Sequence, residues 1–157
     1  MSALVTLPER ALTLWQPWAW LVAAGHKPIE NRPRGFSHKS FRGDFWIHAG
    51  REAWKEQWFI VRGMCDELLV AAFVLPDLGE LTFGAIIGRA TITDIVPPRH
   101  PLLGKYDPAP IVPWHFPDQY GFRVEKAQLL KKPVRCRGYQ GFWHVPEPVL
   151  AELQEAA

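Results

Sequence analysis

Three charged residues within six positions of the chain, Lys27, Glu30 and Arg32, have the types that handle a polar ligand. A lysine in a partly dry cleft holds an oxyanion or a phosphate, or loses its proton if its pKa is lowered. A glutamate activates water as a general base, or pairs with the exocyclic amine of a cytosine-like base. An arginine binds phosphate, or pairs with the glutamate and orients it. A purely structural salt-bridge cluster fits these residue types at least as well.

The segment before these charges is rich in tryptophan and contains a glutamine that could contact a base. Trp15 is the better candidate for stacking on a nucleobase, because Trp18 falls on an apolar helical stripe and is expected in the core. Gln16 could bind a base edge through paired hydrogen bonds of its amide. Its alternative role is to cap a helix that begins at Pro17.

Three further candidate residues for contacting a ligand lie later in the chain. Residues 97–117 form a long proline-rich loop, and loops of this length are commonly functional or disordered. Trp114 and Tyr120 could close a cleft from this loop, or could simply anchor it. His48 is expected either as a hydrogen-bonded core histidine or as a general acid/base at a strand end.

Local signals place a short helix ahead of the charged residues. A strand is predicted at 11–14, and Pro17 is a favourable first residue of a helix. Gly25 is a natural helix stop. Prolines at 28 and 33 disfavour helix in the residues before them, so the chain is expected to be extended there.

In this extended segment, 27–32, alternate side chains point to opposite faces. Glu30 and Arg32 therefore share one face, and Lys27 is expected on the other. Because Lys27 lies next to the turn, local bending could still bring it towards Glu30.

The remaining pattern predicts an α+β fold built on short strands. A long β-branched strand at 84–96 has glycines that allow a bend or bulge. We expect a single domain over 1–157, with its core at about 11–145, folded as a mixed, curled sheet or small β-barrel with a helical insert. The other predicted elements are strands at 44–49, 120–125, 132–137 and 142–145, and helices at 52–61, 66–75 and 146–157.

Composition excludes several classes of protein. The 157 residues are 48% hydrophobic, which is enough for a core, and no apolar run reaches the length of a membrane span. The N-terminus lacks the apolar region of a signal peptide, so a cytoplasmic protein is expected. Cys65 and Cys136 have no disulfide or zinc spacing, and no histidines have metal-ligand spacing. We expect no metal and no cofactor, and find no motif for a serine hydrolase or a nucleotide-driven enzyme.

Charge is unevenly distributed, although the net charge is only +2. Residues 25–51 contain six basic and two acidic residues (+4), and residues 123–137 contain six basic and one acidic (+5). Residues 52–81 contain two basic and six acidic residues (−4). If the two basic segments converge, they form a basic face suited to nucleic acid; otherwise the charges only solvate strands and loops.

Taken together, the motifs resemble the ASCH domain family. The family signature GxKxxExR matches Gly25, Lys27, Glu30 and Arg32, and it follows the LTLWQPWA segment 12–19. Later blocks that look like the family are FRG at 41–43, IHA at 47–49, GAIIG at 84–88, YGF at 120–122 and CRGxxGFW at 136–143. The resemblance covers about residues 12–145.

The resemblance implies a fold similar to PUA domains, a β-barrel with a short helix after its first strand. It also implies RNA binding, in a cleft lined by the signature residues. Some small bacterial members hydrolyse the acetyl amide of N4-acetylcytidine, and ribonuclease activity has been ascribed to others. The amidohydrolases have threonine where this chain has Glu30.

Two hypotheses follow from the residues and the resemblance. The first is a binding module for RNA or a modified nucleotide, with Lys27 and Arg32 on phosphate or carbonyl groups and Trp15 in an aromatic wall. The second is a small hydrolase of a modified nucleoside or of RNA, with Lys27 and Glu30 as the reacting pair. The signature contains no nucleophile besides a water held by Glu30, and this favours binding.

Overall fold

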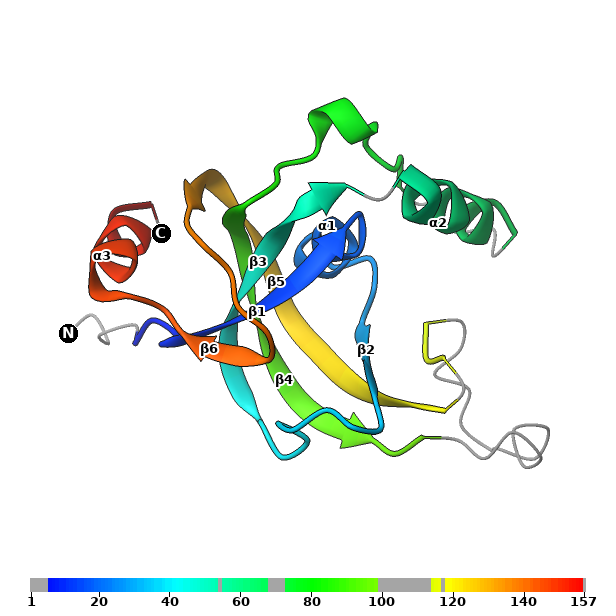
Figure 1. Ribbon diagram of the computed structural model, residues 1–157, viewed down its shortest axis with the longest axis horizontal. Helices are drawn as coiled ribbons and strands as arrows, with labels where there is room; N and C mark the ends of the chain where they lie inside the picture. Colours follow the sequence, from blue (N-terminus) through cyan, green and yellow to red (C-terminus); the bar gives the residue numbers. More distant parts are fainter. Residues whose placement is uncertain (1–5, 54, 68–72, 99–113, 117, 157) are drawn as a thin grey trace.

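The computed structural model describes residues 6–53, 55–67, 73–98, 114–116 and 118–156. Within them, strands form one sheet, and helices lie around it (Figure 1). In chain order the elements are β1 (Arg10–Gln16), α1 (Trp18–Ala23), β2 (Ile29–Pro33), β3 (Gly43–Ala53), α2 (Lys55–Glu67), the 3-10 helix η1 (Leu78–Glu80), β4 (Ala85–Val96), β5 (Gln119–Arg135), β6 (Phe142–His144) and α3 (Glu147–Ala156).

The sheet is mixed, which confirms the predicted α+β class. Its six strands have the order β2-β5-β4-β3-β1-β6. Strand β1 runs parallel to β3, and all other neighbours are antiparallel. Strand β3 contains the strand predicted at 44–49 and lies inside the sheet, and its residues from Phe45 to Ala49 are buried.

The prediction of a closed barrel is wrong, because the sheet stays open between its edge strands β2 and β6. Closure requires that every strand pair on both sides. Strand β6 has only three residues, and the five-residue β2 ends at Pro33, which has no N–H to donate. In place of the backbone hydrogen bonds that would close the sheet, Arg32 Nη2 donates to the Thr13 carbonyl over 3.1 Å. The gap is therefore bridged by a side chain and leaves room for a pocket.

Strand β5 corrects a second prediction. The strands predicted at 120–125 and 132–137 are one continuous strand of 17 residues, whose pairing with β4 shifts register three times. Lys126, with φ 53°, marks one irregularity inside it. The bulge predicted at Gly88 is confirmed by a register shift there, and a Cβ at Gly88 would lie 2.6 Å from the Gln128 carbonyl oxygen.

Helix α1 forms where the sequence predicts and packs on one face of the sheet. Pro17 is its N-cap residue, and Gly25 ends the turn after it with φ 83°. Leu21 and Val22 of the predicted stripe are fully buried. The Leu21 carbonyl accepts from the backbone N–H of Lys27 over 3.0 Å, so the end of the helix fixes where Lys27 starts.

The helical insert between β3 and β4 agrees only in part with the sequence. Helix α2 corresponds to the predicted helix at 52–61 but starts and ends later. Of the helix predicted at 66–75, residues 68–72 lie outside the described residues, and residues 73–75 are not helical. Helix α3 packs against β5 through the buried Leu153. Among the described residues, none of the helices is long and apolar enough to span a membrane.

Candidate functional site

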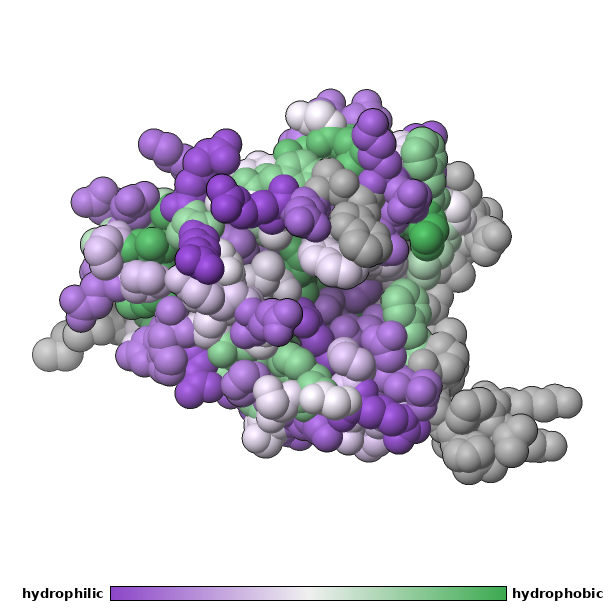
Figure 2. All heavy atoms as spheres, viewed as in Figure 1, coloured by the Kyte–Doolittle hydropathy of each residue, from purple (hydrophilic) through white to green (hydrophobic). Residues whose placement is uncertain are grey.

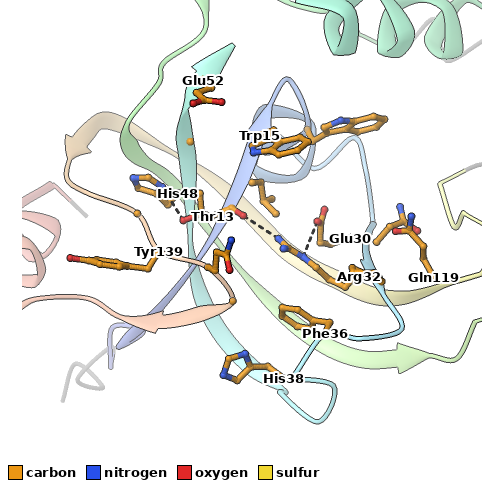
Figure 3. Close-up of a pocket in the computed structure, with 18 of the residues that line it drawn as sticks. Thr13, Trp15, Glu30, Arg32, Phe36, His38, His48, Glu52, Gln119 and Tyr139 are labelled. Atoms are coloured by element: carbon orange, nitrogen blue, oxygen red, sulfur yellow. Dashed lines mark hydrogen bonds and ion pairs between the residues drawn. The ribbon is translucent and has the colours of Figure 1, made fainter. Parts of the chain in front are cut away.

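A pocket of about 1000 Å³ opens where the sheet fails to close. Figure 2 shows hydrophilic residues around this hollowed face, and Figure 3 shows the side chains that surround the pocket. Its walls come from β1, β2, β3, the segment after β2 and the turn before β6. The lining includes Thr13, Trp15, Trp18, Lys27, Glu30, Arg32, Phe36, His38, His48, Gln119, Arg137, Gly138, Tyr139 and Gln140.

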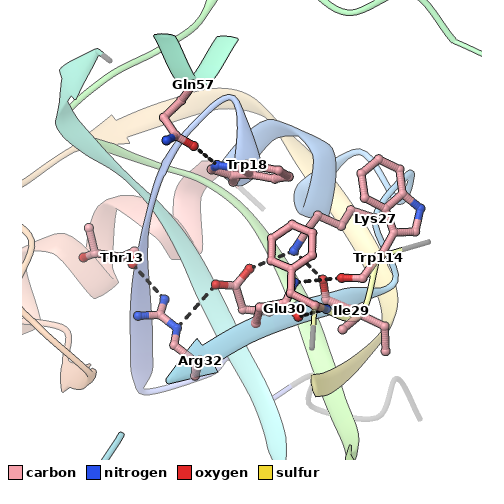
Figure 4. A network of polar contacts seen from close by, with 10 residues as sticks. Thr13, Trp18, Lys27, Ile29, Glu30, Arg32, Gln57 and Trp114 are labelled. Carbon is pink, nitrogen blue, oxygen red and sulfur yellow. Dashed lines mark hydrogen bonds and ion pairs between the residues drawn. The ribbon is translucent and has the colours of Figure 1, made fainter. Parts of the chain in front are cut away.

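One side of the pocket carries the three charged residues of the signature as a connected network (Figure 4). Lys27 Nζ lies 3.3 Å from Glu30 Oε2, and Arg32 Nε lies 3.3 Å from Glu30 Oε1. Lys27 also donates to the Ile29 carbonyl and lies over the Trp18 ring at 5.3 Å from its centroid. Strand alternation predicted Lys27 on the opposite face, and this is wrong: Lys27 precedes β2, and the bend that was the alternative brings it to the same carboxylate as Arg32.

Burial dominates the electrostatics of this network. Lys27 is 2% exposed and Glu30 7%, and desolvation lowers the pKa of the Lys27 ammonium, while attraction to Glu30 opposes the change. Each carboxylate oxygen faces one cation, and the ammonium has two oxygen acceptors. The trio thus supplies a fixed charge pattern at the pocket wall.

The opposite side of the pocket is organised around Thr13 and His48. His48 Nε2 lies 2.9 Å from the Cys136 carbonyl, which can only accept, so Nε2 carries the proton. Its Nδ1, 3.2 Å from Thr13 Oγ1, therefore accepts from the hydroxyl. Trp143 Nε1 donates to the same hydroxyl oxygen over 3.0 Å. Thr13 and His48 are thus held in one defined hydrogen-bonding state.

Packing fixes the His48 ring as well. Burial lowers the pKa of the imidazole, and the hydrogen bond to the Cys136 carbonyl offsets this in part, so the ring is neutral at physiological pH. The turn before β6 lies directly on the ring: a Cβ at Gly138 would lie 2.5 Å from His48 Nδ1 and 2.6 Å from Thr13 Oγ1. Only glycine allows this approach.

Aromatic side chains border the pocket on two sides (Figure 3). Trp15 is 49% exposed and Tyr139 is 48% exposed, which is unusual for large rings. The half-buried Trp18 donates from Nε1 to Gln57 Oε1 over 3.0 Å. Phe36 packs beneath the Arg32 guanidinium, with its centroid 5.2 Å from Cζ. Trp15 and Tyr139 are therefore the two half-exposed rings that border the pocket.

Three of the predicted ligand contacts lie outside the pocket lining. Gln16 is buried; its amide donates to the Thr82 carbonyl and accepts from the Trp20 N–H, as expected for the capping role. Trp114 is buried, and its carbonyl accepts from Asn31 Nδ2, as expected for a loop anchor. Tyr120 lies in β5 under the Lys39 ammonium. The structure brings together Trp15, Lys27, Glu30, Arg32 and His48.

Several lining residues were not predicted. Thr13 belongs to the segment 12–19 that resembles the family but was not singled out, Phe36 lies in no motif, and Gln119 reaches the pocket from the far end of the long loop. The turn with Arg137, Gly138 and Tyr139 belongs to a block that resembles the family, and this was the available signal for it. Among the described residues, no three His, Cys, Asp or Glu side chains are grouped to hold a metal ion.

Comparison with known families agrees with this geometry. The family model of the ASCH domain matches residues 12–132, which is most of the chain. The chain belongs to the ASCH domain family. The matched segment contains the Lys27–Glu30–Arg32 network, Thr13 and His48, and it ends before the turn that carries Tyr139. No curated protein matches the sequence.

Solved structures of the family share the fold. The crystal structure of ASCH from Zymomonas mobilis aligns with a TM-score of 0.54 at 14% identity, covering 93% of both chains. A single-substitution variant of the same protein gives 0.51 at 15% identity, covering 95% of this chain and 98% of that one. A second variant gives 0.53 at 14% identity, covering 93% and 96%. At these identities the likeness concerns the fold alone.

Proposed function

We propose that this ASCH-domain protein binds RNA or a modified nucleotide and places one nucleobase in the pocket. The observation that carries the proposal is the pocket of about 1000 Å³ with two half-exposed rings, Trp15 and Tyr139, at its border. Nucleobases stack on such rings, and single-stranded nucleic acids are recognised mainly in this way.

Polar groups suited to a base edge also line the pocket. The side-chain amides of Gln119 and Gln140 line the pocket, and neither makes a hydrogen bond within the described part of the chain. Each amide offers a donor and an acceptor, the pattern needed for paired hydrogen bonds to a base. Glu30 and Arg32 add a fixed negative and a fixed positive group to the wall.

The contacts of Lys27 and Glu30 support binding over the alternative hypothesis, in which this pair carries out hydrolysis. A general base must contact a water, whereas Glu30 is only 7% exposed and each of its oxygens faces a cation at 3.3 Å. The pair therefore serves to shape the wall and its charge.

Hydrolysis remains the second candidate because of Thr13 and His48. A hydroxyl that donates to a neutral imidazole is the arrangement of a nucleophile beside its base. The test is to incubate the protein with N4-acetylcytidine and with single-stranded RNA, and to follow cytidine and strand cleavage by chromatography. Turnover lost in Thr13→Val would support this candidate, and absence of both products would reject it.

The binding proposal is tested by fluorescence anisotropy with a labelled, mixed-sequence single-stranded RNA decamer. Loss of one stacking ring costs about 1–3 kcal/mol, so Trp15→Ala and Tyr139→Ala should each weaken binding roughly 5- to 150-fold. Phe59→Ala is the matched control, because Phe59 is 65% exposed but lies on α2 away from the pocket lining. Equal affinity of Trp15→Ala and the control would contradict the proposal.

A further inference from the structure

A second, smaller hollow lies beside the pocket and is lined largely by arginines. Its volume is about 530 Å³, and its lining is Arg51, Phe83, Gly84, Arg135, Cys136 and Arg137. Arg51 and Arg137 also line the larger pocket, so the two hollows adjoin at these side chains. A ligand that fills the first can extend into the second.

The fold brings these arginines together from segments far apart in sequence. Arg51 lies on β3, and Arg135 ends β5. Gly84 joins the two: its N–H donates to the Ala49 carbonyl over 2.8 Å, and its own carbonyl accepts from the Cys136 N–H over 3.2 Å. A Cβ at Gly84 would lie 3.4 Å from Arg51 Cγ. The backbone beneath the arginines is thus tied by hydrogen bonds.

The charge of this arginine cluster is not neutralised within the described part of the chain. There, Arg51, Arg135 and Arg137 form no ion pair with a carboxylate, whereas Arg34 and Arg42 pair with Asp118 and Asp94. All three guanidinium side chains are exposed. Three adjacent cations repel one another, and this repulsion is relieved when an anion binds.

Contacts of the cluster suit a phosphate next to a stacked base. The Arg137 guanidinium lies 5.1 Å from the centroid of Tyr139, one of the two exposed rings of the pocket. Arg135 Nη1 uses one donor on the Phe83 carbonyl at 3.5 Å, which leaves its other N–H groups available. Arginine forks of this kind bind phosphate oxygens in pairs.

We propose that Arg51, Arg135 and Arg137 form a phosphate-binding site for the nucleotide next to the one held in the pocket. The ligand is then a strand of single-stranded RNA with at least one phosphodiester, and a free base or nucleoside fills only part of the combined site. This inference rests on the proposed function, because the pocket must hold the base that leads the strand to the arginines.

The test compares two ligands of the 157-residue chain: the single-stranded RNA decamer and a free nucleoside. Arg135→Gln should weaken decamer binding about tenfold at 50 mM salt, and Arg135→Glu should weaken it more. The salt dependence, d log K/d log[salt], should become less steep by about 0.7 to 1 in Arg135→Gln. Nucleoside affinity should not change, because Arg135 does not line the larger pocket.

Arg123→Gln is the matched control, because Arg123 is an exposed arginine of the same strand that lines neither hollow. An equal loss in Arg123→Gln, or an unchanged slope in Arg135→Gln, would overturn the phosphate site while RNA binding in the pocket stands. Failure of the wild-type protein to bind either decamer or nucleoside would instead overturn the proposed function itself.

Discussion

At the scale of single residues, the site depends on the two ion pairs that the Glu30 carboxylate forms. Its two oxygens each face a cation at 3.3 Å, one from Lys27 and one from Arg32, and all three groups are buried or nearly so. The Arg32 guanidinium also donates a hydrogen bond to the Thr13 carbonyl, across the opening of the sheet. The carboxylate therefore holds both the pocket wall and the bridge between β2 and β1.

Removal of the Glu30 charge should lower the free energy of unfolding. Glu30→Gln leaves the buried Lys27 ammonium and the half-buried Arg32 guanidinium with a neutral partner, and breaking a buried pair in this way typically costs about 3–5 kcal/mol. Denaturant unfolding measures the loss. Asp118→Asn breaks the Arg34 pair, which is more than half exposed, and should cost less than about 1 kcal/mol. Similar losses in the two variants would show that the network is not the stabilising element described.

The buried imidazole predicts a dependence of stability on pH. Burial lowers the pKa of His48 in the folded protein below 6.5, the ordinary value for histidine. Between these two pKa values the unfolded chain binds more protons than the folded protein does. The contribution of His48 to the free energy of unfolding is therefore complete above about pH 6.5 and is lost as the pH falls below it. The fall in unfolding free energy from pH 7.5 to pH 5 should be smaller in His48→Gln, which keeps a donor for the Cys136 carbonyl.

His26, whose pKa burial also lowers, contributes in the same direction. Because His26 is present in both wild type and His48→Gln, the difference between their unfolding free energies at the two pH values reports on His48 alone. His26→Gln is the control that removes the other histidine and leaves the pocket intact. An identical pH profile in wild type and His48→Gln would contradict the neutral, doubly hydrogen-bonded imidazole.

At the scale of elements, the turn between β5 and β6 completes the pocket. It brings Arg137 and Tyr139 to the border while Gly138 rests against His48 and Thr13. The turn can approach β1 and β3 this closely only because Gly138 has no side chain. The position of the exposed Tyr139 ring therefore depends on one glycine.

Gly138→Ala should displace this turn, because its Cβ would lie within 2.6 Å of buried atoms of His48 and Thr13. Overpacking of this kind costs about 1–3 kcal/mol, and RNA affinity should fall as well. Gly35→Ala is the control: Gly35 also lines the pocket, but its added Cβ meets no atom within 4 Å. Thermal unfolding and anisotropy measure the two effects, and wild-type behaviour of Gly138→Ala would refute the close contact.

Local sequence signals predicted the elements that depend on local chemistry. Pro17, Gly25 and the β-branched run of β4 specify a helix start, a helix stop and a strand without help from distant residues. They could not predict that the sheet stays open, because closure depends on pairing between β2 and β6, which are far apart in the chain. The continuity of β5 was missed for a similar reason, since its irregular middle is held by pairing with β4.

In the candidate site, too, only the features that depend on neighbouring residues could be predicted. Lys27, Glu30 and Arg32 share one short segment, so their types and spacing pointed to the network. Thr13, His48 and Gly138 meet only because β1 and β3 lie side by side and the last turn folds over them. Contacts of this kind join residues that are far apart in the sequence, so local sequence patterns do not predict them.

At the scale of the whole molecule, the opening of the sheet and the distribution of charge meet at one place. The two basic segments predicted from the sequence do converge, since Arg51 belongs to one and Arg135 and Arg137 to the other. They meet beside the pocket whose border holds the two exposed rings. The fold therefore places an aromatic pocket and a basic hollow on one continuous surface.

The most direct test of this account is an NMR titration of nitrogen-15-labelled protein with a mixed-sequence single-stranded RNA heptamer. If the pocket holds a base, the largest shifts should be those of the Trp15 indole N–H and the Gly138 and Tyr139 amides, with little change at Phe59 or Leu153. Saturation by RNA with no shift at Trp15, Gly138 or Tyr139 would contradict the account.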